Sequence, residues 1–205
     1  MRILPQRVIS FSLDRLGKLA SLFISLHIHP NTLSVIALFS GLGVGVLFIL
    51  EKPLFAGILI IICGLFDILD GKVAVRTNRK SLYGAIFDST LDRYSEFFIY
   101  LGLAFHFRTH WGLWLVIFAF LGSTMVSYTR ARAEGLGIEC KIGLMQRAER
   151  MIFLSLGSIL GSSLKAFDPA MIVVLGAIAL FSNITAFQRT FYVKKAEKKG
   201  TRKEV

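Results

Sequence analysis

The chain has 205 residues, of which 54% are hydrophobic and 18% charged, and its mean hydropathy is +0.64. This composition is more apolar than that of an ordinary soluble domain and argues against that class. The net charge of +11 would favour nucleic-acid binding in a soluble protein. Here the basic residues instead follow the pattern of a membrane topology, so no nucleic-acid partner is expected.

Residues 1–28 are predicted to form an interfacial helix. From Arg7 to Leu26, charged residues are spread among apolar ones, and no uninterrupted apolar core of a signal peptide is present. We therefore expect an amphipathic helix that lies in the membrane surface. Its charged residues are Arg7, Asp14, Arg15 and Lys18.

Six apolar stretches follow, each near the roughly 20 residues needed to cross a hydrocarbon core about 30 Å thick. Short charged connections separate them, and no low-complexity linker divides the chain. The sequence therefore predicts an all-α, polytopic membrane protein with six transmembrane helices in one domain, residues 1–205. The predicted spans are Thr32 to Leu50, Pro53 to Val75, Leu82 to Phe105, Trp111 to Thr129, Met145 to Leu164 and Pro169 to Val193.

Lysine and arginine concentrate on one side of this predicted topology. With six spans, 21 of the 24 basic residues fall on the side of the two termini. Only Lys52, Arg108 and Lys165 fall on the other side. By the positive-inside rule both termini are cytoplasmic, in a multi-pass protein of the cell membrane that contacts membrane lipids. Residues 194–205 are expected to form a basic cytoplasmic tail.

Four aspartates stand out because they fall inside two consecutive predicted spans. The sequence has six Asp in all, and these four are Asp67, Asp70, Asp88 and Asp92. A carboxylate near the bilayer centre costs about 2.5 to 3.5 kcal/mol, so four of them need compensation on the order of 10 kcal/mol. A bound cation would supply it.

The spacing of these acids brings them together. Asp67 and Asp70 are three residues apart and Asp88 and Asp92 four apart, so each pair shares one face of its helix. The two helices form a hairpin, which places the pairs at similar depth. Converging carboxylates suit Mg²⁺ or Mn²⁺, and two ions about 3.5 to 4 Å apart would make a clamp for phosphoryl chemistry.

Two other interpretations account for the acids without an enzyme. In the first, they only pair with nearby cations, namely Arg76, Arg79, Lys80 and Arg93. In the second, they form the permeation site of a divalent-cation transporter, which would need polar residues on the non-cytoplasmic half of the spans, where almost none occur. An inactive membrane scaffold would normally have lost some of the four acids.

The same region resembles the signature of the CDP-alcohol phosphotransferase family, D-x2-D-G-x2-A-R-x8-G-x3-D-x3-D. The matching segments are DILDGKVAV, from Asp67 to Val75, and GAIFDSTLD, from Gly84 to Asp92. One position departs, because the family's arginine is Val75 here and Arg76 follows it. A neighbouring residue points about 100° away on a helix.

The resemblance implies a homodimeric enzyme with six spans and an active site open to the cytoplasm. It would transfer a phosphatidyl group from CDP-diacylglycerol to an alcohol and release CMP, using two Mg²⁺ or Mn²⁺ ions. By the same resemblance, the four aspartates ligate the metals and Asp92 is also the general base. The residues expected to bind the donor nucleotide are Asn31, Gly71, Ala74, Arg76 and Gly84.

Later segments are most similar to those of prokaryotic phosphatidylinositol-phosphate synthases. They are SYTRARAE from Ser127, QRAER from Gln146, and a late arginine. The resemblance implies that Arg130, Arg150 and Arg189 hold the phosphate of a phosphorylated polyol, inositol phosphate in the leading interpretation. Phosphatidylglycerophosphate synthase, which uses glycerol 3-phosphate, stays open as an alternative. So does a purely topological role of the arginines under the positive-inside rule.

Overall fold

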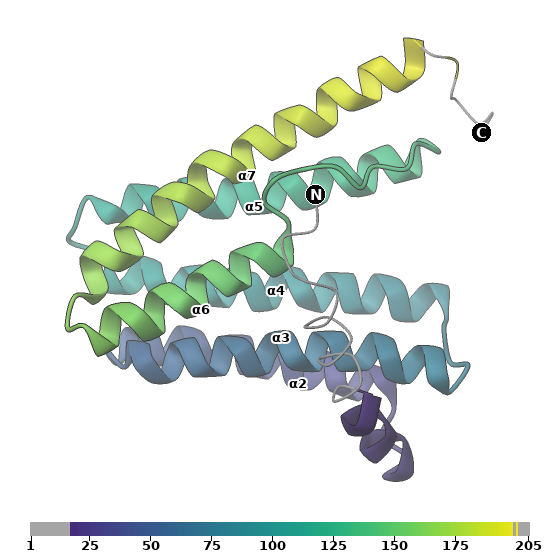
Figure 1. Cartoon of the computed structure of the whole chain (residues 1–205), viewed down its shortest axis with the longest axis horizontal. Helices are drawn as coiled ribbons and strands as arrows, with labels where there is room; N and C mark the ends of the chain where they lie inside the picture. The colour runs from purple at the N-terminus through teal and green to yellow at the C-terminus, as the bar shows by residue number, and fades with distance from the viewer. Residues whose placement is uncertain (1–16, 199, 201–205) are drawn as a thin grey trace.

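The computed structural model describes residues 17–198 and 200, and this part of the chain folds into helices joined by short connections (Figure 1). The all-α prediction is confirmed. A short helix at residues 17–25 comes first. It is followed by α2 (Pro30–Ile49), α3 (Pro53–Arg76), α4 (Leu82–His106), α5 (Gly112–Gly135), α6 (Arg147–Ser163) and α7 (Phe167–Lys198).

Helices α2, α3, α5 and α7 are long and apolar enough to cross a membrane by length and composition. The protein is therefore a polytopic membrane protein. Helices α4 and α6 cover the other two predicted spans but are less apolar or shorter. Helix α4 carries Asp88, Asp92, Arg93 and Glu96, and α6 has 17 residues that begin with the charged sequence RAER.

Local sequence signals set where the helices of the site begin. Proline occupies the start of α2 and α3, where its missing N–H needs no partner. At the start of α4, the Ser81 hydroxyl accepts a hydrogen bond from the Gly84 N–H at 2.9 Å. This cap fixes the first turn of α4 and with it the positions of Asp88 and Asp92 along the helix.

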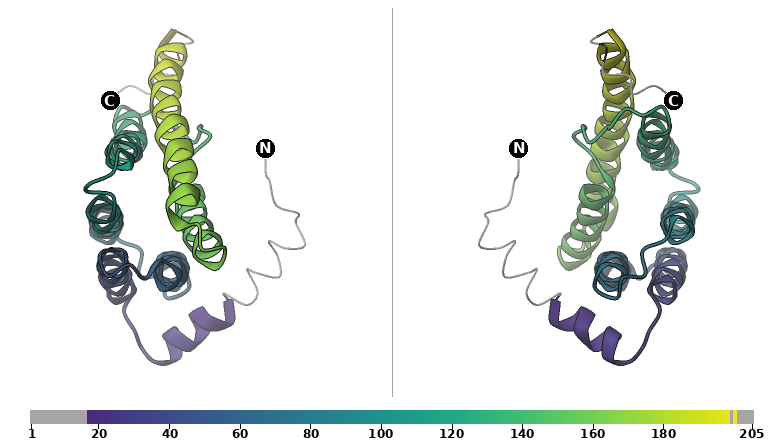
Figure 2. Two further views of the ribbon diagram at one scale, coloured as in Figure 1. Left: turned by 90° about the vertical axis from the view of Figure 1, so that its left-hand side faces the viewer. Right: turned by 90° about the vertical axis from the view of Figure 1, so that its right-hand side faces the viewer.

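Helix α2 packs against both α3 and α4, while α3 also packs against α6, and α7 against α5 and α6 (Figure 2). Glycine allows close helix crossings at Gly41, Gly45, Gly157 and Gly161. A Cβ added at any of the four would lie under 3.0 Å from atoms of another helix or connection. At Gly45 the obstacle is the backbone carbonyl of Phe98 on α4. At Gly41 and Gly45 the close crossing is between α2 and α4, the helix that carries Asp88 and Asp92.

The helix at residues 17–25 lies at one end of the bundle and runs across its long axis (Figures 1 and 2). Ala20 is buried in a small cluster with Leu33, Leu69 and Val73, whereas Leu22 is exposed. Residues 1–16 of the predicted interfacial helix lie outside the described residues, as do residues 199 and 201–205 of the predicted tail, and residues 26–28 lead through a turn to α2. The α3–α4 and α5–α6 connections and the end of α7 lie at this same end of the bundle.

Candidate active site

Three of the four aspartates converge from two helices. Asp67 and Asp70 lie on α3 and Asp88 on α4, and each offers a carboxylate oxygen within 4.8 Å of the others. Ser34 of α2 donates a hydrogen bond to Asp70 Oδ2 at 2.7 Å, which orients the most buried of these carboxylates. The hairpin therefore brings the acids together at one depth, as the spacing predicted.

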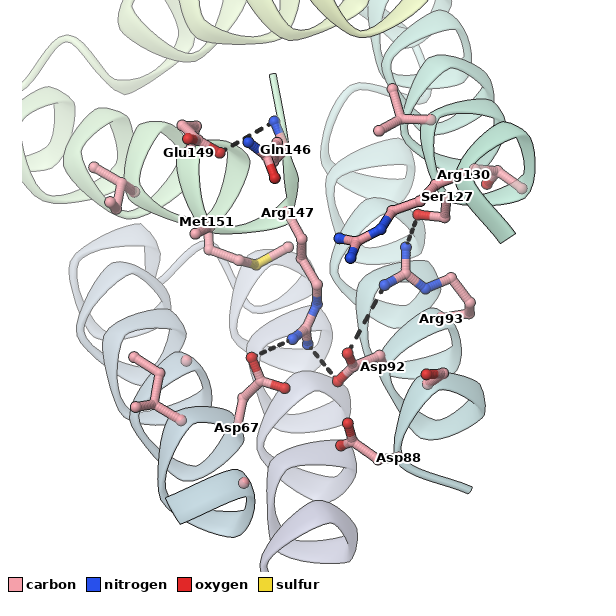
Figure 3. A pocket seen from close by; sticks show the side chains of 18 of the residues that line it. Asp67, Asp88, Asp92, Arg93, Ser127, Arg130, Gln146, Arg147, Glu149 and Met151 are labelled. Atoms are coloured by element: carbon pink, nitrogen blue, oxygen red, sulfur yellow. Dashed lines mark hydrogen bonds and ion pairs between the residues drawn. The ribbon is translucent and has the colours of Figure 1, made fainter. Parts of the chain in front are cut away.

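Asp92 lies one turn further along α4 and faces arginines. Arg147 Nη2 is 2.8 Å from Asp92 Oδ1, and Arg93 Nη2 is 3.8 Å from Asp92 Oδ2 (Figure 3). Arg93 also donates to the Ser127 hydroxyl of α5. Asp92 thus borders the same cavity as the other acids, but it is not part of the group of three carboxylates.

Arg147, at the start of α6, bridges the two helices of the hairpin. Its Nη1 is 2.5 Å from Asp67 Oδ2, while Nη2 pairs with Asp92. Four cations near the acids were named above as partners from the sequence. Among the described residues, Arg93 is the one of the four that forms an ion pair with an acid of the site, Asp92. The main counter-ion instead comes from a segment more than fifty residues away.

Arg150 and Glu96 form a buried, two-pronged ion pair between α6 and α4. Arg150 donates from Nε to Glu96 Oε1 at 2.8 Å and from Nη2 to Oε2 at 3.0 Å. The Arg150 side chain is fully buried and that of Glu96 is 3% exposed. Arg150, which the resemblance assigns to acceptor phosphate, is thus engaged by Glu96 and is not among the residues that line the cavity. The pair holds the first turn of α6 against α4.

Arg130 and Arg189 line the cavity, as expected for a phosphate pocket. Arg130 pairs with Glu134 at 2.8 Å on the exposed end of α5. Arg189 is buried and donates to the carbonyl of Ile142 at 2.8 Å and to that of Val126. Both cations therefore line the same cavity, and the Arg130 side chain is the more exposed of the two.

Of the residues expected to bind the nucleotide, Gly71 lines the cavity, and a Cβ added there would meet nothing within 4 Å. Gly84 lies beside Ser81 and Asn31 at the hairpin turn. Ala74, Gly84 and Asn31 are not among the residues that line the cavity. A nucleotide that reaches them would extend out of the cavity toward the hairpin turn.

Arg76 points away from the acids. Its Nη1 donates to the carbonyl of Gly17 at 2.7 Å and to the Ser21 hydroxyl at 3.0 Å. This follows from its position one residue after Val75, because the next helical residue turns by about 100°. In the described structure, Arg76 ties α3 to the helix at residues 17–25.

The cavity that these residues line has a volume of about 1160 Å³ and is lined by both apolar and charged residues. The larger apolar residues come mainly from α3 and α6, with Val126 from α5, and the charged residues come from all of α3 to α7. The apolar residues include Ile60, Ile61, Leu65, Ile68, Met151 and Ile152, and the charged residues include Asp67, Asp70, Asp88, Asp92, Arg93, Arg130, Arg147 and Arg189. Such a cavity can hold a molecule with an apolar tail and an anionic head.

The residues at the acids fit a divalent metal ion. Carboxylate oxygens are the ligands that Mg²⁺ and Mn²⁺ prefer. Asp88 Oδ1 is buried and has no hydrogen-bond partner within the described structure, and a cation would satisfy this acceptor. Asp67, Asp70 and Asp88 can therefore hold the ion, with Asp92 close to it.

Comparison with known proteins decides the family. The model of the CDP-alcohol phosphatidyltransferase family matches residues 27–187. The chain belongs to this family. An archaetidylinositol phosphate synthase of Pyrococcus horikoshii is 34% identical over 189 residues, which cover 92% of this chain and 94% of that protein. One of Methanothermobacter thermautotrophicus is 44% identical over 131 residues, 63% of this chain and 65% of that protein.

Solved structures of a family member are similar in fold to this phosphatidyltransferase. The phosphatidylinositol phosphate synthase of Mycobacterium tuberculosis with bound CDP-DAG aligns with a TM-score of 0.78 at 26% identity, covering 87% of this chain and 92% of that one. Its complex with manganese and citrate also aligns with a TM-score of 0.78, at 25% identity over 87% and 88% of the two chains. The family resemblance found in the sequence is confirmed.

Sequence reasoning missed two residues of the site, Arg147 and Glu96. Arg147 lies in the QRAER segment, where the resemblance points to Arg150, and Glu96 lies outside the family signature. A signal for Glu96 was present, because it follows Asp92 by four residues and so continues the acidic face of α4 into the span. Nothing in the sequence showed which arginine of α6 reaches which acid.

Proposed function

We propose that the chain transfers a phosphatidyl group from CDP-diacylglycerol to inositol phosphate and releases CMP. The observation that carries the proposal is the group formed by Asp67, Asp70 and Asp88, which borders a cavity lined by both apolar and charged residues. A CDP-linked lipid matches this lining, since its acyl chains suit the apolar residues and its pyrophosphate suits the acids through a metal. Family membership favours this transferase over a cation transporter.

Two observations support the proposed identity of the acceptor. Arg130 and Arg189 line the cavity near the acids, and guanidinium groups bind phosphate in a planar, two-pronged geometry. The relatives reported above are named as synthases of inositol-phosphate lipids. Together these favour inositol phosphate over glycerol 3-phosphate.

In the reaction, the acceptor's hydroxyl oxygen forms a bond to the lipid-bearing phosphorus of the donor, and the bond from that phosphorus to the CMP oxygen breaks. Asp92 borders the cavity and accepts the hydroxyl proton. Asp67, Asp70 and Asp88 hold the divalent ions, two Mg²⁺ in our proposal. Bound ions neutralise charge on the pyrophosphate and on the departing CMP. Arg130 and Arg189 orient the acceptor through its phosphate.

For the chain as a whole we propose one membrane domain in which α4 and α6 also cross the membrane, giving six spans. The helix at residues 17–25 would lie in the cytoplasmic interface, because it runs across the bundle at the end where the basic connections lie. Both termini would then be cytoplasmic, and the assembly would be a homodimer, as the family resemblance implies.

The function is tested by CMP release from the purified protein with CDP-diacylglycerol and Mg²⁺. Inositol 1-phosphate, glycerol 3-phosphate, inositol and serine are supplied in separate reactions. We expect release with inositol 1-phosphate to exceed the others. If CMP release is fastest with glycerol 3-phosphate, that compound and not inositol phosphate is the acceptor. No release with any acceptor would contradict the proposed activity.

The role of Asp92 is tested with Asp92→Asn. This change removes the base and leaves the three converging carboxylates, so turnover should fall at least about 100-fold while donor binding stays largely intact. Asp168→Asn is the matched control, since Asp168 pairs with His106 at 2.8 Å and neither lines the cavity. Normal turnover in Asp92→Asn would refute the assigned role.

A further inference from the structure

Arg147 lies where its charge competes with a metal ion. Its guanidinium joins Asp67, a member of the three-carboxylate group, to Asp92 at 2.5 and 2.8 Å (Figure 3). Asp67 Oδ2 and Asp92 Oδ1 are thereby engaged by a cation. Both carboxylates are needed elsewhere in the proposed reaction, Asp67 as a ligand and Asp92 as a base, so the observed pairing is not the arrangement that performs the transfer.

The pairing of Arg147 is also incomplete. Its Nε is buried and has no hydrogen-bond partner among the described residues. A guanidinium stays charged at every relevant pH, so it cannot relieve repulsion from a nearby divalent ion by losing a proton. An ion bound through Asp67 would therefore repel Arg147 and displace its side chain from this carboxylate.

The backbone of Arg147 is held in place, and its side chain borders the cavity. Arg150, one turn later, is locked to Glu96, and the Glu149 carboxylate accepts the Gln146 N–H at 3.1 Å, which caps the first turn of α6. Arg147 lines the cavity together with Arg130. A guanidinium released from Asp67 and Asp92 therefore stays inside the space that the substrates' phosphates would enter.

We propose that Arg147 is an internal counter-ion that holds Asp67 and Asp92 until a divalent ion binds and then turns to a phosphate of the substrates. This inference rests on the proposed function for the identity of the phosphate, which belongs either to the donor's pyrophosphate or to the acceptor. Arg147 is then a substrate-binding residue as well as a competitor of the metal. The Oδ1 atom of Asp92 becomes free to accept a proton when Arg147 leaves it.

The first test measures Mn²⁺ affinity without substrate, by electron paramagnetic resonance of the full chain in detergent. Arg147→Gln should bind Mn²⁺ roughly tenfold more tightly than the unaltered protein, because Asp67 and Asp92 lose the competing cation. Arg130→Gln is the control for general loss of positive charge, since Arg130 pairs with Glu134 and not with the acids. Its affinity should change much less. An equal or weaker affinity in Arg147→Gln would overturn the proposal.

Arg147→Lys keeps the charge and tests the geometry. An ammonium lacks the planar fork that spans two carboxylates. The Mn²⁺ affinity of Arg147→Lys should therefore fall between those of Arg147→Gln and the unaltered protein. An affinity equal to that of Arg147→Gln would show that the charge itself does not compete with the metal.

The second test measures binding of CDP-diacylglycerol and of inositol 1-phosphate separately, at saturating Mn²⁺. Arg147→Gln should weaken one of them about tenfold or more, which identifies the phosphate that Arg147 contacts. Unchanged binding of both would overturn the substrate-binding half of the proposal. Because the Mn²⁺ measurement needs no turnover, it decides the metal half even if the transferase assay fails.

Discussion

Removing the charge of Glu96 should destabilise the protein through Arg150. Glu96 accepts two hydrogen bonds from this fully buried guanidinium, at 2.8 and 3.0 Å. Glu96→Gln leaves the guanidinium without its anion, and breaking one side of a buried pair costs about 3 to 5 kcal/mol. For a chain of this size that corresponds to a decrease in Tm of roughly 6 to 20 °C.

The assay is thermal unfolding of the purified protein in one detergent. Glu134→Gln is the matched control, because the Arg130–Glu134 pair has the same chemistry but side chains that are 41% and 42% exposed. Such surface pairs contribute about 1 kcal/mol or less. The double change Glu96→Leu with Arg150→Met should recover most of the loss, since an apolar pair of similar volume removes both charges of the buried pair.

Two outcomes would refute this reasoning. Glu96→Gln and Glu134→Gln with the same Tm would show that the buried pair contributes no more than the exposed one. A double variant as unstable as Glu96→Gln would show that the loss comes from packing and not from an uncompensated charge. In either case Glu96 would not hold α6 against α4.

Further predictions concern residues behind the acids and at the helix crossing. Ser34→Ala should weaken Mn²⁺ binding by roughly tenfold or more, because the hydroxyl that orients Asp70 at 2.7 Å is lost; unchanged affinity in a metal titration would contradict this. Gly45→Ala should lower stability by about 1 to 3 kcal/mol, because its Cβ meets the Phe98 carbonyl. Gly176→Ala is the control, since a Cβ there meets nothing within 4 Å, and equal melting of both variants would argue against a tight crossing.

The sequence predicts the helices and the meeting of the acids because both depend on local spacing. Stretch length and proline positions place α2 and α3 within a few residues of their observed ends, Pro30–Ile49 and Pro53–Arg76. The intervals between Asp67, Asp70 and Asp88 across a short hairpin leave little freedom in how the carboxylates meet. Six crossings, by contrast, remain a proposal, since α4 and α6 are less apolar or shorter than the other spans.

The partners of Arg147 and Arg150 cannot be predicted from local spacing in the sequence. Arg147 and Arg150 lie three residues apart on the first turn of α6, so the sequence presents both toward the same neighbouring helices. Which one meets Asp92 and which one meets Glu96 depends on the rotation and depth of α6 against α3 and α4. These are set by packing between segments distant in the sequence.

The proposed transfer requires that the aspartates hold a divalent ion in contact with the donor's pyrophosphate. Electron-nuclear double resonance on the Mn²⁺-loaded protein with CDP-diacylglycerol tests it by detecting ³¹P nuclei bonded to the ion through oxygen. We expect a ³¹P coupling that is lost, together with Mn²⁺ binding, in Asp70→Asn. Bound Mn²⁺ without a ³¹P coupling, or Mn²⁺ binding that is unchanged in Asp70→Asn, would contradict it.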